Sequence, residues 1–132
     1  MQNAFSSYSS APLLARIDLS SNRLTQLPVD AFAGLTALRD VNLDKNFFAS
    51  VPTAALQQVG ISTGTQTRQR TQVRTLEDLS LGLNNIKELS NAALPFPALK
   101  ALSLEGNDLE YISRDVFQQT NNLLYLYIGI NR

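Results

Sequence analysis

The side chains that could do chemistry in this chain are its carboxylates and its basic groups, because cysteine and histidine are absent. Without cysteine there is no thiolate nucleophile and no disulfide framework. Without histidine, the usual structural zinc sites and the histidine-based triads are excluded as well. The 11 acidic and 11 basic residues balance, so the net charge gives no general attraction to nucleic acid. No apolar run approaches the roughly 20 residues needed to span a bilayer, and we expect no direct membrane insertion.

Among the carboxylates, Asp40 and Asp78 are the pair with the clearest chemical potential. Two carboxylates side by side can share a proton or a divalent cation. These two lie far apart in the sequence, so they meet only if the fold repeats itself between them. Whether Asp40 and Asp78 lie close together therefore depends on the secondary-structure elements that contain them.

Leucine recurs at fixed intervals along the chain. The pattern is Leu-x-x-Leu-x-Leu-x-x-Asn-x-Leu-x-x-Leu, with Ile, Val or Phe at some of the apolar positions. Its starts are separated by 24, 38, 23 and 24 residues, and they are Leu14, Leu38, Leu76, Leu99 and Leu123. A fixed period of this length is typical of a solenoid. The leucine spacing of three, two and three is not a helical period, which argues against an amphipathic helical domain.

The pattern resembles that of the leucine-rich repeat family, in its form with about 24 residues per repeat. Phe32 and Phe117 match each other in the second half of the repeat, whereas Leu56 and Leu94 stand where that Phe would be. The resemblance implies an α/β solenoid: a segment of a right-handed horseshoe with a concave parallel β-sheet of about five strands. Loops and short helices would form the convex side.

The repeat frame predicts the domain organisation. We expect full repeats at 14–37, 38–61, 76–98 and 99–122 and a partial repeat at 123–132, with residues 1–13 as the tail of an earlier repeat or a weak cap. The partial repeat stops at its Asn, which favours a fragment of a larger repeat protein. The long spacing places a polar insertion at 60–75, rich in Thr and Gln, whose composition predicts a mobile loop.

That insertion contains three arginines and no acid: Arg68, Arg70 and Arg74. They could contact an acidic partner or a phosphate. A solvated loop is the simpler interpretation, and the lack of an aromatic stacking platform argues against nucleic-acid binding.

An asparagine closes the strand segment of every repeat. Its amide can both donate and accept, so it can satisfy the backbone groups that an inward turn buries. Stacked repeats would align these residues in a ladder of Asn22, Asn46, Asn84, Asn107 and Asn131.

The residues between the buried leucines predict a concave face, where repeat proteins usually bind their partners. Read in register, the whole face is slightly acidic and its first two repeats present charged side chains, while the fifth repeat presents Tyr and apolar side chains that are typical of interaction hot spots. Packing against a further repeat, or the preference of Tyr for strands, would explain that composition equally well. The candidate partner-binding residues are Arg16, Asp18, Arg39, Asp40, Asn42, Asp44, Glu77, Asp78, Ser80, Lys100, Ser103, Glu105, Tyr125 and Tyr127.

The same frame places Asp40 and Asp78 in one column of this face. An open sheet gives little of the burial that an acid–base pair needs, and Arg16, Arg39 and Lys100 are simpler partners for the two carboxylates. We therefore expect no catalytic residue, no cofactor and no bound metal.

The sequence favours a non-catalytic module that binds a protein or peptide on its concave face, within a larger receptor or adaptor. The alternatives are a structural spacer of a receptor or receptor kinase, and self-association through uncapped ends of the solenoid, which a concentration series in sedimentation would reveal. The compartment stays open between an extracellular part of a membrane receptor and the cytoplasm. No Asn is followed two residues later by Ser or Thr, so the N-glycosylation sites common in extracellular members of the family are absent. The lack of cysteine is weaker evidence on the compartment, because cysteine-rich caps would lie outside a fragment.

Overall fold

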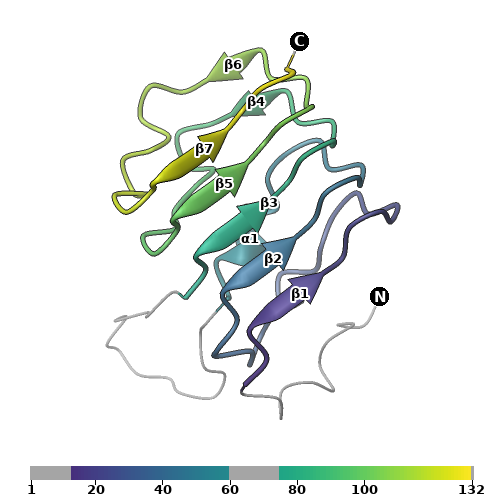
Figure 1. Ribbon diagram of the computed structural model, residues 1–132, viewed down its shortest axis with the longest axis vertical. Coiled ribbons are helices and arrows are strands. Elements are labelled where there is room, and N and C mark those ends of the chain that lie inside the picture. Colours follow the sequence, from purple (N-terminus) through teal and green to yellow (C-terminus); the bar gives the residue numbers. More distant parts are fainter. Residues whose placement is uncertain (1–12, 60–74, 132) are drawn as a thin grey trace.

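The computed structural model describes residues 13–59 and 75–131 of the 132-residue chain (Figure 1). Its main element is a parallel sheet of five short strands, in the order β1-β2-β3-β5-β7. The strands are β1 (Arg16–Asp18), β2 (Asp40–Asn42), β3 (Asp78–Ser80), β5 (Ala101–Ser103) and β7 (Tyr125–Tyr127). Figure 1 shows them stacked in chain order, from purple β1 to yellow β7, with the return segments behind the sheet. The predicted right-handed solenoid, with one parallel sheet of about five strands, is confirmed.

The middle residue of each strand points away from the open face of the sheet. Ile17, Val41, Leu79 and Leu102 stand in register with one another and are buried. Leu126 continues this row but is 38% exposed, because β7 has a neighbouring strand on one side, β5. The alternation that the sequence predicted therefore separates the core from the open face.

The return side consists mainly of loops and a short helix, as the resemblance implied. Over the part of the chain that the structure describes, it contains one helix, the four-residue α1 (Thr53–Leu56). A second parallel sheet pairs β4 (Glu88–Leu89) with β6 (Tyr111–Ile112). The sequence did not predict this small sheet. It forms because two consecutive return segments run in register, and backbone amides of Glu110 and Ser113 donate to the earlier segment at 2.7 and 2.8 Å.

The predicted asparagine ladder is present, and Asn84 shows how it works. The Asn84 amide donates to the carbonyls of Leu43, Leu81 and Gly82 at 3.0–3.1 Å. Its oxygen accepts the backbone N–H of Phe48, in the preceding repeat, at 3.0 Å. One side chain thus closes its own turn and ties that turn to its neighbour. Asn46, Asn107 and Asn131 make equivalent bonds to their preceding repeats.

The residue before each of these asparagines adopts a left-handed backbone conformation. Its φ is between 54° and 58° at Ser21, Lys45, Leu83 and Ile130, and 70° at Gly106. This conformation disfavours side chains with a Cβ atom, yet four of the five positions carry one. The repeated turn overrides local preference at these sites.

The predicted tail at 1–13 and the predicted insertion at 60–75 lie outside the described residues, apart from Leu13 and Thr75. The Thr75 hydroxyl donates to the carbonyl of Leu38. The proposed repeat boundaries remain a prediction.

The ladder yields a prediction for stability. Asn84→Ala should lower the free energy of unfolding by about 2–4 kcal/mol, because several buried backbone groups lose their partner. Urea denaturation followed by circular dichroism measures this.

Asn22→Ala is the matched control, since Asn22 is exposed and donates to Leu19 and Ser20 in its own turn. We expect a loss below about 1 kcal/mol there, because water replaces the lost bonds. Equal losses at the two positions would show that the bonds between repeats add nothing.

Candidate functional site

The open face of the five-stranded sheet carries the columns that the sequence predicted. Arg16, Asp40, Asp78, Ala101 and Tyr125 pair in register. Asp18, Asn42, Ser80, Ser103 and Tyr127 form the parallel column two residues further on. The alignment of these residues is confirmed, whereas their part in binding a partner stays a prediction.

Ion pairs on this face follow the columns. Arg16 Nε lies 2.9 Å from a carboxylate oxygen of Asp40, its neighbour in register. In the column before it, the Glu77 carboxylate oxygens lie 2.8 Å from the Lys100 ammonium nitrogen and 3.7 Å from an Arg39 guanidinium nitrogen. The hydrogen bond from Lys100 holds the pKa of Glu77 below its ordinary value. Cations thus pair with acids on adjacent strands at the same register position.

The same rule corrects one expectation about Asp78. The sequence suggested Arg16, Arg39 and Lys100 as partners for Asp40 and Asp78, but Arg16 pairs with Asp40 and the other two pair with Glu77. Asp78 stands in register between Asp40 and Ala101, so no cation occupies an adjacent position in its column. Within the described ranges, Asp78 forms no ion pair.

The surroundings of Asp78 disfavour its charge. Asp78 is exposed, yet desolvation raises the pKa of its carboxyl above the ordinary value, and the neighbouring Asp40 and Glu77 carboxylates raise it further. The Arg16 and Lys100 charges offset part of this shift. Within the described residues, Asp78 is therefore a carboxylate at the open face that no cation pairs with directly.

Asp78 borders a shallow hollow in the sheet face, about 180 Å³ in volume. We call it the central hollow. The backbone of Leu79 and Leu102 closes it from below, since their side chains point into the core, and small side chains lower the surface around it. The remaining lining residues are Asp40, Ser80, Ala101, Ser103 and Tyr127.

Polar groups at the carboxyl ends of the strands are held in fixed positions. The Asp44 carboxylate accepts the Ser80 hydroxyl at 2.5 Å and the backbone N–H of Gly82 at 2.6 Å. Hydrogen bonds from Ser20 lower the pKa of Asp18, and the Asn42 side chain accepts the N–H of Asp44 at 2.9 Å. Sequence reasoning found these residues but not the bond that fixes the Ser80 hydroxyl.

The fifth repeat presents the apolar end of the face. Tyr125 and Tyr127 are 57% and 49% exposed, and Leu124 and Ile130 are exposed beside them in the sequence. The face therefore changes along the stack from paired charges on β1 and β2 to aromatic and aliphatic side chains on β7.

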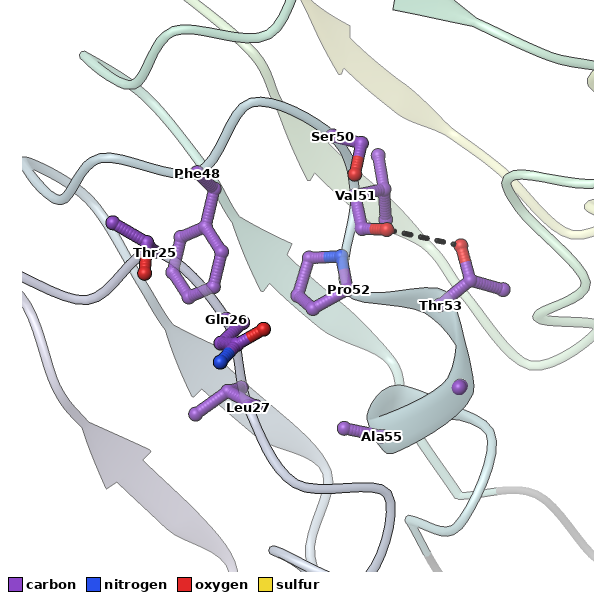
Figure 2. Close-up of a pocket in the computed structure, with 10 residues that line it drawn as sticks. Thr25, Gln26, Leu27, Phe48, Ser50, Val51, Pro52, Thr53 and Ala55 are labelled. Carbon is purple, nitrogen blue, oxygen red and sulfur yellow. Dashed lines mark hydrogen bonds between the residues drawn. The ribbon is translucent and has the colours of Figure 1, made fainter. Parts of the chain in front are cut away.

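A second hollow lies among the return segments, at about 270 Å³, and Figure 2 shows its lining. Phe48, Pro52 and Leu27 contribute its apolar walls. The Thr53 hydroxyl is bonded within the protein, to the carbonyls of Val51 and Ala93. No titratable side chain lines this hollow. It offers no chemistry.

Comparison with known proteins decides the family. A family model described as leucine rich repeat matches residues 12–60 and 74–132, on both sides of the predicted insertion.

The chain belongs to the leucine-rich repeat family.

Similar leucine-rich repeat proteins are much longer than this chain. It is 32% identical over 131 residues to human leucine-rich repeats and immunoglobulin-like domains protein 3, covering 90% of this chain and 11% of that protein. It is 32% identical over 134 residues to human epiphycan, covering 95% and 40%. The chain thus spans well under half the length of these relatives.

A solved structure shows the same leucine-rich repeat fold. The crystal structure of a TLR13–ssRNA13 complex superposes with a TM-score of 0.66 at 26% sequence identity, covering 96% of this chain and 20% of that one. The single-stranded RNA in that complex is a ligand of TLR13.

Within the described ranges, no group of three or more acidic, histidine or cysteine side chains could hold a metal ion. No helix found there is long and apolar enough to cross a membrane. The candidate basic contact Arg68, Arg70 and Arg74 lies outside the described residues.

The raised pKa of Asp78 predicts an unusual pH effect. The protonated form of Asp78 supports folding below the unfolded-state value near 3.8, and this contribution is lost as the pH rises through the higher folded value. Asp78→Asn should therefore raise the free energy of unfolding at pH 7, by less than about 1 kcal/mol because solvent screens the carboxylate. The gain should vanish below the unfolded-state value, as urea titrations at several pH values would show.

Asp18→Asn is the control of opposite sign. Its pKa is lowered, so the ionised form of Asp18 supports folding above its unfolded-state value, and that support is lost as the pH falls through the folded value. The substitution should not stabilise the protein at pH 7. Stabilisation by both variants would mean that a general loss of negative charge, and not the position of Asp78, is responsible.

Proposed function

We propose that this leucine-rich repeat segment is a non-catalytic protein-binding module, part of a larger receptor or adaptor, and that a protein or peptide ligand docks on its concave face. The observation that carries the proposal is the composition of the open sheet face. Paired charges cover one end, exposed tyrosines cover the other, and the central hollow lies between them.

Each part of this face has a role in such docking. Tyr125 and Tyr127 supply large, rigid contact area with a polar tip, which is typical of residues that dominate binding energy. The ion pairs at Asp40 and Glu77 are exposed and contribute little affinity, but charges of this kind guide the approach of a partner and select against like charge.

The chemistry of the face argues against catalysis. The sequence has no thiol or imidazole, and the carboxylates lie on an open surface that cannot exclude water. Such a surface suits recognition, because the rigid sheet fixes many side chains at once without enclosing a substrate. Self-association through the ends of the stack and a purely structural spacer role remain the alternatives.

The test is to select peptides from a displayed random 12-residue library and to measure their affinity for variants by biolayer interferometry. Tyr127→Ala and Tyr125→Ala should each weaken binding at least about fivefold, as truncation of a central aromatic contact does. Neither should lower stability much, because both side chains are about half exposed.

Tyr111→Ala is the matched control, since Tyr111 is 59% exposed but lies in β6 on the return side. Binding should stay within about twofold of the unmodified chain, because a tyrosine outside the interface contributes little. Peptides that depend on Tyr111 and ignore Tyr125 and Tyr127 would move the binding face to the return side. Failure to select any peptide would favour the spacer role.

A further inference from the structure

We infer that the central hollow receives a lysine or arginine side chain of a protein partner, held by the Asp78 carboxylate and covered by the Tyr127 ring. The inference rests on the proposed function and names the chemistry of the partner at that face. It follows from three properties of the hollow: its charge, its hydrogen-bonding capacity and its shape.

The charge around the hollow is unbalanced at one position. Arg16 forms an ion pair with Asp40. Lys100 and Arg39 both form ion pairs with Glu77. Asp78 lies between these pairs and forms no ion pair within the described residues. A cation delivered from outside would supply what the column lacks, since Ala101 stands in register where a basic side chain would pair with Asp78.

The hydrogen-bonding groups around the hollow favour a ligand that donates hydrogen bonds. The Ser80 hydroxyl donates its proton to Asp44, so its oxygen faces a ligand as an acceptor. The ionised Asp78 carboxylate accepts only. A guanidinium or an ammonium group carries several N–H donors and no acceptor, which complements this set. A phosphate or a carboxylate would meet acceptors and negative charge.

The shape of the hollow fits one side chain. Ser80, Ala101 and Ser103 are small, so the surface drops between the Arg16–Asp40 pair and Tyr127. The side chains of Leu79 and Leu102 point into the core, so their backbone closes the hollow from below and leaves room above it for one long side chain. Tyr127 lines the same hollow, and an aromatic face attracts a cation within about 6 Å.

A metal ion is a poorer occupant. Asp40, the other carboxylate that lines the hollow, is already bonded to Arg16, and calcium prefers six to eight oxygen ligands. A cation from a partner would also offset the repulsion between Asp78 and the neighbouring Asp40 and Glu77 carboxylates.

The experiment uses the whole chain, labelled with ¹⁵N, and three pentapeptides: acetyl-Gly-Arg-Gly-Arg-Gly-amide and its Gln and Glu counterparts. The Arg peptide should shift the amide signals of Leu79, Ser80, Ser103 and Tyr127 saturably. The Gln and Glu peptides should bind at least about tenfold more weakly, because each lacks the cation that Asp78 needs.

Variants test the two contacts separately. Asp78→Asn should weaken the Arg peptide about three- to tenfold, while Glu110→Gln, an equal change of charge on the return side, should leave it within about twofold. Tyr127→Leu should weaken it about three- to fivefold and Tyr127→Phe much less, since Phe keeps the aromatic face.

Several outcomes would overturn the inference. Equal losses in Asp78→Asn and Glu110→Gln would mean unspecific attraction, and equal binding of the Gln peptide would remove the need for a cation. Micromolar calcium or a uridine decanucleotide shifting the same amides in place of the Arg peptide would assign the hollow to another ligand. Library peptides that depend on Tyr127 but are not enriched in Lys or Arg would leave the proposed function standing without this inference.

Discussion

The asparagine side chain at the end of each strand is the contact on which the stack depends. Short strands of three residues offer few backbone bonds, and the turns that follow them bury polar groups. An asparagine amide such as that of Asn84 satisfies carbonyls of its own turn and a carbonyl and an N–H of the preceding repeat. Burying these groups without partners would oppose stacking. Because each ladder residue from Asn46 onward serves two repeats, the register between strands is fixed together with the turn.

Fixed register explains the electrostatics of the open face. When parallel strands stack without slippage, each side chain meets residues at the same position of adjacent repeats. Glu77 meets two cations, Asp40 meets one, and Asp78 meets an acid and an alanine. Glu77 and Asp78 are adjacent in the sequence, yet the pKa of Glu77 is lowered and that of Asp78 is raised. The neutral composition of the whole chain conceals this local imbalance.

The open face therefore combines rigidity with unmet bonding capacity. The Ser80 hydroxyl is oriented by Asp44, strand backbone closes the central hollow from below, and Tyr127 is carried by a strand rather than by a loop. Side chains placed in this way lose little conformational freedom when a ligand binds, which lowers the entropic cost of binding.

The sequence by itself determined the repeat, the strand positions, the buried rows and the asparagine ladder, because a periodic chain that must bury every repeat in the same way has few solutions. Its columns also followed, since alternation within Arg16–Asp18 or Asp78–Ser80 settles which residues face outward. Only the tertiary structure decided which acids are paired, that Ser80 is tied to Asp44, that small side chains leave a hollow beside Tyr127, and that β4 pairs with β6. These features depend on side-chain geometry and on distances between repeats. A shift of one residue changes which side chains meet, and the local sequence pattern does not predict that.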